Sequence, residues 1–194
     1  MYQLKSLFEG APDSPGYAQG FLSLVARMLE RVDAAAVANL AGLVEEAGSA
    51  GRTIYTLGNG GSAAVASHFV NDMGVNSWVA GKRGFRVCSL ADNVASVTAV
   101  ANDVSFEEIF RRQLACGMTS GDLVIALSVS GNSPNVIRAV EYANEAGGVT
   151  VGLCGFDGGR LARIAQHAVV IPSSKDEYGP VEDAFSVVFH AVSS

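Results

Sequence analysis

The chain has 194 residues, of which 49% are hydrophobic and 16% are charged, and its formal net charge is -6. This length and apolar content predict one domain with a large core and with enough apolar surface for buried subunit interfaces. The net negative charge argues against nucleic acid as the main ligand.

The cysteines and the N-terminal residues bear on where the protein works. Cys88, Cys116 and Cys154 are widely spaced and odd in number, and no C-x-x-C pair is present, which fits reduced thiols in a cytosolic protein. Residues 1–5 open no signal peptide, and no apolar run approaches membrane-spanning length. We therefore expect a soluble cytoplasmic protein with no membrane partner.

The first 48 residues predict two helices. Ser14 and Pro15 fit an N-cap and a first helical position, and apolar residues follow with helical spacing to about residue 32. Asp33 then fits the N-cap of a second helix. We expect the two helices to form a hairpin whose apolar faces pack on the rest of the chain or on another subunit.

From Arg52 onward, short β-branched runs alternate with helical patterns. The predicted strands are Thr53–Leu57, Phe85–Leu90, Leu123–Leu127, Val149–Leu153 and Ala168–Ile171. The predicted helices fall at about 62–73, 93–101, 105–116, 134–146, 158–164 and from 180 onward. This alternation predicts an α/β fold over residues 49–194, a three-layer α/β/α sandwich with a parallel five-stranded sheet. Ligands of such sheets bind beyond the carboxyl ends of the strands.

The segment 127–133, Leu-Ser-Val-Ser-Gly-Asn-Ser, lies between a predicted strand and a predicted helix. The hydroxyls of Ser128, Ser130 and Ser133 and several free backbone N–H groups then gather at one helix N-terminus, where the helix dipole favours a phosphate. The turn lacks the lysine of a Walker-type nucleotide loop. It therefore predicts a site for the phosphate group of a small metabolite.

A glycine-rich turn, Gly58–Ser62, follows the first predicted strand. Its glycines allow tight turning and a close approach of the backbone to a ligand, but such a turn is also found as a plain connection. The spacing does not match the G-x-G-x-x-G pattern of dinucleotide-binding folds.

Two pairs of residues with metal-binding side chains lie on predicted helices. His68 and Asp72 are four residues apart and share a helix face, and Glu182 and His190 lie about two turns apart on an apolar helix. Each pair fits part of a divalent-metal site. Taken alone, His68 and Asp72 fit a helix hydrogen bond or a surface pair better than a metal site, and His190 equally fits a satisfied core histidine.

Together these segments resemble the sugar isomerase (SIS) domain family and, within it, the phosphoheptose isomerases. The resemblance covers most of the chain, including the two N-terminal helices. The motifs that carry it are Gly58-Asn59-Gly60-Gly61-Ser62, Ser67-His68-Phe69, Ala101-Asn102-Asp103, Ser128-Val129-Ser130-Gly131-Asn132-Ser133, Gly155–Gly159 and Val181-Glu182-Asp183 with His190. The serine turn is specific to SIS domains. Its combination with Gly58–Ser62 and the helices is specific to the heptose-isomerase branch and its close non-catalytic relatives.

The resemblance implies a flavodoxin-like fold, a homotetramer with sites between subunits, bound zinc, and conversion of sedoheptulose 7-phosphate to D-glycero-D-manno-heptose 7-phosphate through an enediol. It implies that the substrate is bound by Asn59, Gly60, Ser62, Asn102, Asp103, Ser128, Val129, Ser130 and Ser133. It implies a metal site made of His68, Asp72, Glu182 and His190, in which Asp72 is the base and His190 the acid.

Two positions depart from the family. Asp72 stands where the family usually has a longer Glu, and Glu182 stands where it usually has a neutral Gln, which makes Glu182 a rival base. One Asp, one Glu and two His remain a sound ligand set for zinc or another first-row metal. Another ketose phosphate remains an alternative substrate. The alternative function is a non-catalytic SIS protein that senses phosphosugars or binds a replication-initiator protein.

Overall fold

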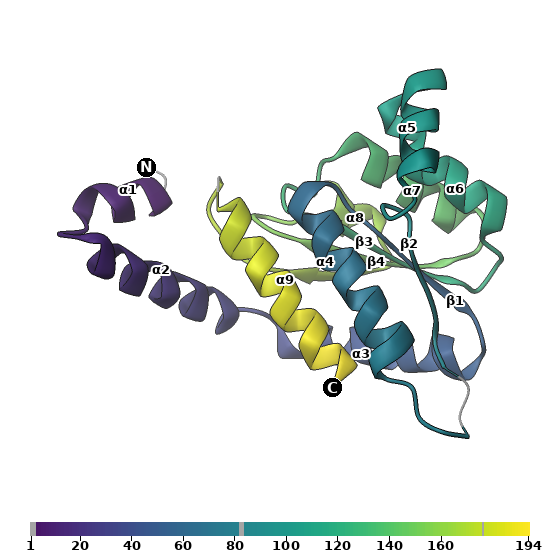
Figure 1. Cartoon of the computed structure of the whole chain (residues 1–194), viewed down its shortest axis with the longest axis horizontal. Coiled ribbons are helices and arrows are strands. Elements are labelled where there is room, and N and C mark those ends of the chain that lie inside the picture. The colour runs from purple at the N-terminus through teal and green to yellow at the C-terminus, as the bar shows by residue number, and fades with distance from the viewer. Residues whose placement is uncertain (1–2, 82–83, 176) are drawn as a thin grey trace.

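The computed structural model describes residues 3–81, 84–175 and 177–194 (Figure 1). Its centre is a five-stranded sheet in the order β2-β1-β3-β4-β5, in which every neighbouring pair is parallel. The strands are β1 (Thr53–Leu57), β2 (Arg86–Ser89), β3 (Leu123–Ser128), β4 (Val149–Cys154) and β5 (His167–Val170). The predicted parallel five-stranded sheet is confirmed.

Helices cover both faces of the sheet, as alternate residues of the central strand β3 show. Leu123, Ile125 and Leu127 belong to one buried core, and Val124 and Ala126 belong to a second. The first core includes residues of α3 (Ala34–Ser49), α4 (Gly60–Asn71) and α9 (Tyr178–Ser193). The second is covered by α5 (Val94–Asp103), α6 (Ile109–Gly117), α7 (Pro134–Glu145) and α8 (Leu161–Ile164). Because successive strand residues point to opposite faces, this partition gives the predicted three layers.

Both predicted N-terminal helices are present, as α2 (Ser14–Leu29) and α3, and a short helix α1 (Gln3–Gly10) precedes them. Asp33 caps α3 as predicted, by accepting a hydrogen bond from the Ala35 N–H at 2.9 Å. The cap of α2 is Asp13, one residue before the predicted Ser14, because the Asp13 carboxylate accepts a hydrogen bond from the Gly16 N–H at 2.7 Å.

Helices α2 and α3 contribute differently to the fold. Helix α3 packs on the sheet and on α9, and it buries Leu40 and Val44 in the first core. Helix α2 contacts α1 and α9 and extends away from the sheet, at the left of Figure 1. Helix α3 thus shares its core with the strands, and the division of the chain at residue 48 stays a prediction.

Two predicted helices have different bounds in the structure. The helix predicted at 62–73 is α4, and it passes directly into a π-helix, η1 (Asp72–Asn76). The helix predicted at 158–164 is α8, which begins three residues later than expected. The reason is local, since Gly158 and Gly159 have φ angles of +86° and +56°, outside the range of a right-handed helix.

The topology brings the two predicted ligand-binding turns to one edge of the sheet. Strands β1 and β3 are parallel neighbours, with Leu57 opposite Ala126 at their carboxyl ends. The glycine turn after β1 and the serine turn after β3 therefore emerge side by side, where parallel α/β sheets bind their ligands.

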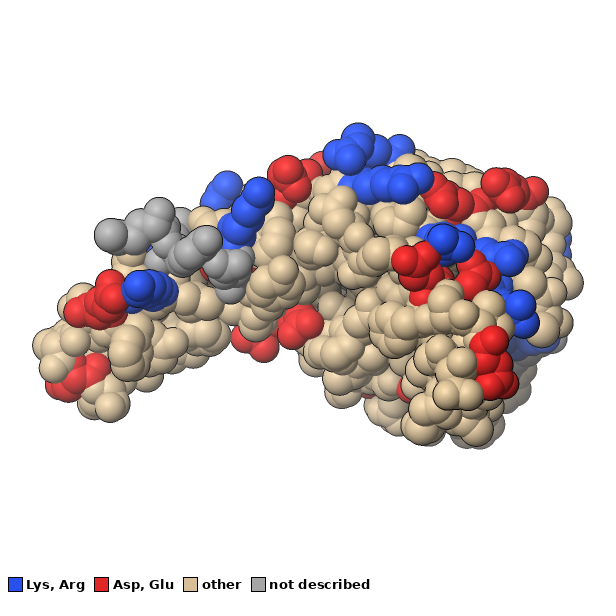
Figure 2. All heavy atoms as spheres, turned by 90° about the horizontal axis from the view of Figure 1, so that it is seen from above, with Lys and Arg blue, Asp and Glu red and all other residues tan. Residues whose placement is uncertain are grey.

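The molecular surface mixes the two signs of charge. On the face shown in Figure 2, Lys and Arg side chains lie among Asp and Glu side chains over the sheet domain. Within the described residues, no helix combines the length and the apolar character needed to span a membrane.

Candidate functional site

The serine turn joins the end of β3 to the start of α7. Ser128 is the last residue of the strand and Ser133 is the N-cap of the helix, and their hydroxyl oxygens lie 3.0 Å apart. The Ser133 side chain makes no capping bond to α7, so its hydroxyl stays turned toward Ser128. Gly131 closes the turn with a φ of +63°, and its N–H donates to the Ser128 carbonyl at 2.9 Å. The turn thus presents hydroxyls and a helix N-terminus on one side, as predicted for an anion site.

The glycine turn after β1 is fastened to α7 by a pair of amides. Asn59 donates to the Asn135 side-chain oxygen at 2.9 Å, and Asn135 donates back to the Asn59 oxygen at 2.8 Å. Asn135 is only 1% exposed. Asn59 is therefore engaged within the chain, and its partner Asn135 is a site residue that sequence reasoning missed. Its one signal was a polar residue directly after Pro134 on an otherwise apolar face.

A small pocket of about 120 Å³ lies between the two turns. Its predicted lining residues are Asn59, Ser62, Ser128, Val129, Ser130, Ser133 and Glu182. Tyr178, which was not predicted, also lines it and packs edge-on against Phe156 with ring centroids 5.3 Å apart. Gly60, predicted to bind substrate, begins α4 in a left-handed conformation and is exposed.

Glu182 lies in this pocket. Its Oε1 accepts a hydrogen bond from the Ser62 hydroxyl at 3.3 Å, and its carboxylate takes the space that a Cβ would need at Gly61. Glycine at position 61 is therefore required for α9 to place this carboxylate against α4. The predicted role of Glu182 as a metal ligand stays a prediction, because in this structure the carboxylate binds Ser62.

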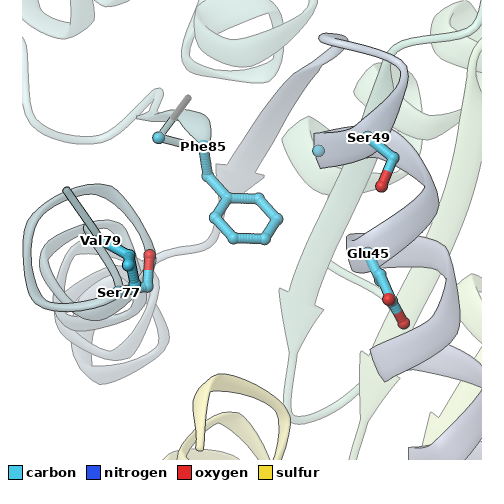
Figure 3. A pocket seen from close by; sticks show the side chains of 7 residues that line it. Glu45, Ser49, Ser77, Val79 and Phe85 are labelled. Atoms are coloured by element: carbon cyan, nitrogen blue, oxygen red, sulfur yellow. The ribbon is translucent and has the colours of Figure 1, made fainter. Parts of the chain in front are cut away.

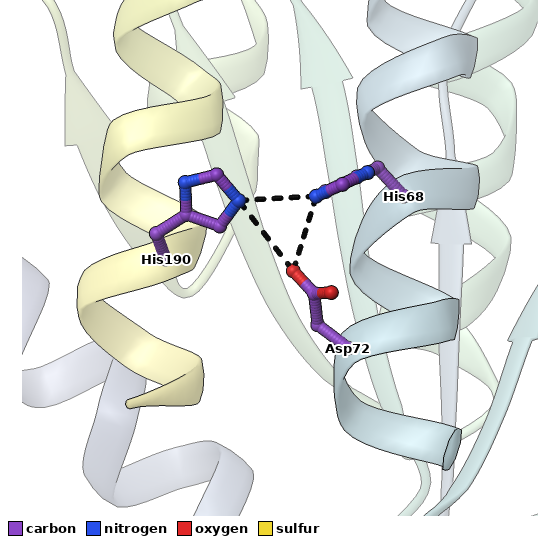
Figure 4. Close-up of side chains that lie close together, drawn as sticks. All are labelled: His68, Asp72 and His190. Atoms are coloured by element: carbon purple, nitrogen blue, oxygen red, sulfur yellow. Dashed lines mark hydrogen bonds and ion pairs between the residues drawn. The ribbon is translucent and has the colours of Figure 1, made fainter. Parts of the chain in front are cut away.

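A second cluster of polar groups lies between α4 and α9, and Figure 4 shows its three side chains pointing toward one another. The Nε2 atoms of His68 and His190 are 3.0 Å apart. The Oδ2 atom of Asp72 is 3.3 Å from His68 Nε2 and 3.6 Å from His190 Nε2. The two imidazoles are about half exposed, at 54% and 56%, whereas the Asp72 side chain is only 14% exposed.

Aromatic packing beneath the cluster sets the positions of the two histidines. Phe69 follows His68, Phe189 precedes His190, and both phenylalanines are buried. Their rings stack with centroids 4.1 Å apart, and this stack fixes α4 against α9. The distance between the imidazoles therefore depends on the core and not on contacts at the surface.

Two predicted substrate-binding residues lie apart from both the pocket between the turns and the histidine cluster. Asn102 and Asp103 end α5, are exposed, and bond to each other, with Asn102 Nδ2 donating to Asp103 Oδ1 at 2.8 Å. They are not among the residues that line the pocket between the turns.

Ion pairs hold α7, and with it the serine turn, against the segment before α6. Arg138 pairs with Glu107 at 2.6 Å and with Glu108 at 2.8 Å, and Arg111 pairs with Glu108 at 2.6 Å. Glu107 and Glu108 belong to a short 3-10 helix, η2 (Phe106–Glu108). Burial by itself raises the pKa of Glu108, but the hydrogen bonds and charges of the two arginines outweigh it, so that its pKa is lowered below the ordinary value.

A larger hollow of about 430 Å³ lies at the opposite edge of the sheet, where α3 ends and β2 begins (Figure 3). Its labelled lining residues are Glu45, Ser49, Ser77, Val79 and Phe85. Among the described residues that line it, only Glu45 is ionisable, and the hollow lies away from the carboxyl ends of the strands. We therefore place the functional site at the smaller pocket, where the polar groups converge.

Comparison with known proteins shows the family of the chain. The SIS domain family matches residues 16–155. Phosphoheptose isomerase from Citrifermentans bemidjiense is 40% identical over 139 residues, which are 72% of this chain and 72% of the relative. Phosphoheptose isomerase from Trichlorobacter lovleyi is 40% identical over 156 residues, 80% of this chain and 79% of the relative. The chain belongs to the phosphoheptose isomerase branch of the SIS domain family.

A solved structure extends the likeness to three dimensions. The phosphoheptose isomerase GmhA from Neisseria gonorrhoeae superposes with a TM-score of 0.83 at 26% identity, over 91% of this chain and 94% of that one. The family resemblance and the α/β fold expected from the sequence are thus confirmed.

Proposed function

We propose that this chain interconverts a ketose phosphate and an aldose phosphate through an enediol, with sedoheptulose 7-phosphate and D-glycero-D-manno-heptose 7-phosphate as the substrate pair. Membership of the phosphoheptose isomerase branch makes the chain an intramolecular oxidoreductase acting on a phosphosugar. The observation that carries the proposal is that α4 and α9 contribute to both groups. Ser62 and Glu182 line the pocket at the serine turn, and the His68, Asp72 and His190 cluster lies further along the same two helices.

The serine turn is proposed to hold the phosphate end of an open-chain sugar. Ser128, Ser130 and Ser133 supply hydroxyl donors, and the N-terminus of α7 adds partial positive charge. The described residues that line the pocket include no lysine or arginine, so the phosphate would be held by dipoles and neutral donors. Such a cradle fixes one end of the sugar and leaves the carbonyl end free to reach the cluster.

His68, Asp72 and His190 are proposed to hold zinc or another first-row divalent ion. Ligand atoms around a tetrahedral ion with bonds of about 2.0–2.1 Å lie about 3.3 Å apart. The three atoms of the cluster are 3.0, 3.3 and 3.6 Å apart, which matches that spacing. An ion held by these residues would supply Lewis-acid polarisation of the sugar carbonyl.

Proton transfer between C1 and C2 needs a base and an acid on the chain. We propose His190 as the acid, because histidine is the side chain most often used to transfer protons in catalysis and this imidazole is half exposed at the cluster. Asp72 is the proposed base, and Glu182 is its rival because it lines the sugar pocket. Asp72→Asn should weaken both metal binding and turnover. If Glu182 is the base instead, Glu182→Gln should abolish turnover while the metal stays bound.

The complete site is proposed to form in a cytoplasmic homotetramer. The arm formed by α1 and α2 leaves large apolar side chains uncovered, with Phe8 71% and Leu22 64% exposed, which suits packing on another subunit. Asn102 and Asp103 are proposed to reach the site of a neighbouring subunit. The three cysteines are free thiols, which suits a reducing compartment.

The test is to incubate zinc-loaded protein with sedoheptulose 7-phosphate in D2O and to follow the sugar by NMR. We expect an aldoheptose phosphate to appear, with deuterium at C2 wherever the transferred proton exchanges with solvent. Binding without product or deuterium exchange would instead favour the non-catalytic sensor or scaffold. No binding would favour a different ketose phosphate.

A further inference from the structure

Asp72 is the first residue of the π-helix η1, which follows α4 without a break. The wider turn is closed by the Ser77 N–H, which donates to the Asp72 carbonyl at 2.9 Å. π-turns inside helices are uncommon and are often found at functional sites. Here the turn brings Asn76, at its end, within reach of the Asp72 side chain.

The two oxygens of the Asp72 carboxylate have different surroundings. Oδ2 faces His68 Nε2 at 3.3 Å and His190 Nε2 at 3.6 Å. Oδ1 faces the other way and accepts a hydrogen bond from Asn76 Nδ2 at 3.2 Å, with Asn71 Nδ2 farther off at 3.4 Å. One oxygen is thus directed into the histidine cluster, and the other is held by amide donors.

We propose that Asn76 is a positioning residue that makes Asp72 bind the metal through Oδ2 alone. This inference rests on the metal site proposed above. A carboxylate can bind a metal ion through one oxygen or through both, and an amide N–H on the second oxygen competes with the metal for it. A ligand that uses one oxygen leaves a coordination position open, which a catalytic metal needs for its substrate.

The two partners of this bond differ in exposure, because Asn76 is exposed whereas the Asp72 side chain is only 14% exposed. Water therefore competes for the Asn76 amide, but it has little access to the Asp72 carboxylate. Aspartate also has a short side chain, so its carboxylate swings through a small arc that one bond can fix. Outer hydrogen bonds of this kind commonly set both the orientation of a metal ligand and the affinity for the metal.

The experiment is a Co2+ titration of the intact chain, followed by visible absorption and by calorimetry. In Asn76→Ala we expect Co2+ affinity to fall about tenfold or more. We also expect the visible absorption of bound Co2+ to weaken, because Oδ1 is released to coordinate and five-coordinate Co2+ absorbs less than four-coordinate Co2+. Asn76→Leu, which keeps the approximate shape but has no donor, should behave in the same way.

Asn71→Ala is the matched control, because it removes an amide from the same oxygen at the longer distance of 3.4 Å. We expect it to keep Co2+ affinity and absorption within about twofold of the wild type, as a change this small is below 0.5 kcal/mol. Wild-type affinity and spectrum in both Asn76 variants would overturn the positioning role while leaving the metal site standing. Absence of Co2+ binding by the wild-type protein would instead overturn the metal site itself.

Discussion

The two halves of the site are built in different ways. The phosphate half is one continuous segment of six residues, Ser128–Ser133, between a buried strand and a helix, and its shape is set largely by main-chain conformation. The metal half joins three side chains from two helices, with His68 and His190 separated by 122 positions. The first half therefore depends on local backbone geometry, and the second depends on the packing of α4 against α9.

This difference predicts that substitutions can disrupt phosphate binding and metal binding separately. Damage to the turn should weaken phosphate binding and leave metal affinity unchanged. Damage to the cluster should remove metal binding and chemistry and leave phosphate affinity unchanged.

The largest expected effect is that of His190→Gln. It removes both a metal ligand and the proposed acid, so we expect turnover to fall about a thousandfold. Affinity for inorganic phosphate, measured by calorimetry, should stay near the wild-type value. His167→Gln is the control, because that partly buried histidine on β5 contacts Asn39 and lies outside the cluster. Lost phosphate binding in His190→Gln, with turnover retained at saturating substrate, would contradict the separation of the two halves.

Next in size is Gly131→Ala, which tests the main-chain half. Gly131 has a φ of +63°, and an added Cβ would overlap the carbonyl group of Gly158. Left-handed strain and this overlap together should lower the free energy of unfolding by about 3 kcal/mol. The variant should also lose phosphate affinity while it keeps Co2+ affinity.

Gly42→Ala supplies the control for Gly131→Ala. Gly42 lies within α3 and has open space around the position of a Cβ. An alanine there should raise helix stability by about 0.5–1 kcal/mol. Urea unfolding of the two variants in parallel measures the contrast, and equal effects would show that the turn tolerates a side chain at position 131.

The same difference between a continuous segment and a set of distant side chains explains which site residues could be predicted from the sequence. The serine turn could be found from the sequence because its hydroxyls, its glycine and the following helix are adjacent along the chain. His68 and Asp72 could be paired because four residues bring two side chains to one helix face. His190 could be joined to them only through the family resemblance, since nothing in local spacing places α9 beside α4.

Other features depend on tertiary contacts that no local pattern contains. The amide pair of Asn59 and Asn135 forms only when β1 and β3 are neighbours. The bond from Ser62 to Glu182 arises because α9 passes over the start of α4.

Ser133→Ala is expected to have a moderate effect that is confined to binding. It removes one hydroxyl from the phosphate cradle and leaves the backbone of the turn in place. A hydrogen bond to a charged group contributes about 1.5–3 kcal/mol, so KM should rise about tenfold or more with a smaller change in kcat. Ser120→Ala is the control, because this exposed serine lies before β3, at the other end of the strand, and its hydroxyl donates to the Gly147 carbonyl at 3.3 Å. A fall in kcat with unchanged KM would assign Ser133 to the chemical step.

The smallest expected effect is that of Glu108→Gln, which tests how α7 and its turn are anchored. Arg138 and Arg111 hold the pKa of the Glu108 carboxyl below its ordinary value of 4.5 despite the opposing effect of burial. A group with a lowered folded-state pKa stabilises the fold above its unfolded pKa, and this contribution is lost as pH falls through the folded value. Because both arginines are partly exposed, the variant should lose only about 1 kcal/mol of unfolding free energy at pH 7.

The pH dependence separates a charge effect from a packing effect. Urea unfolding at pH 7 and at a series of values below 4.5 should show the difference between wild type and Glu108→Gln shrinking as the wild-type carboxylate takes up its proton. Glu145→Gln, an exposed change at the end of α7 at a residue without an ion-pair partner among the described residues, should show no such convergence. A difference that persists unchanged at low pH would mean that the shape of Glu108, and not its charge, holds α7. In that case packing in the core alone would hold the phosphate turn in place, as it holds the histidine cluster.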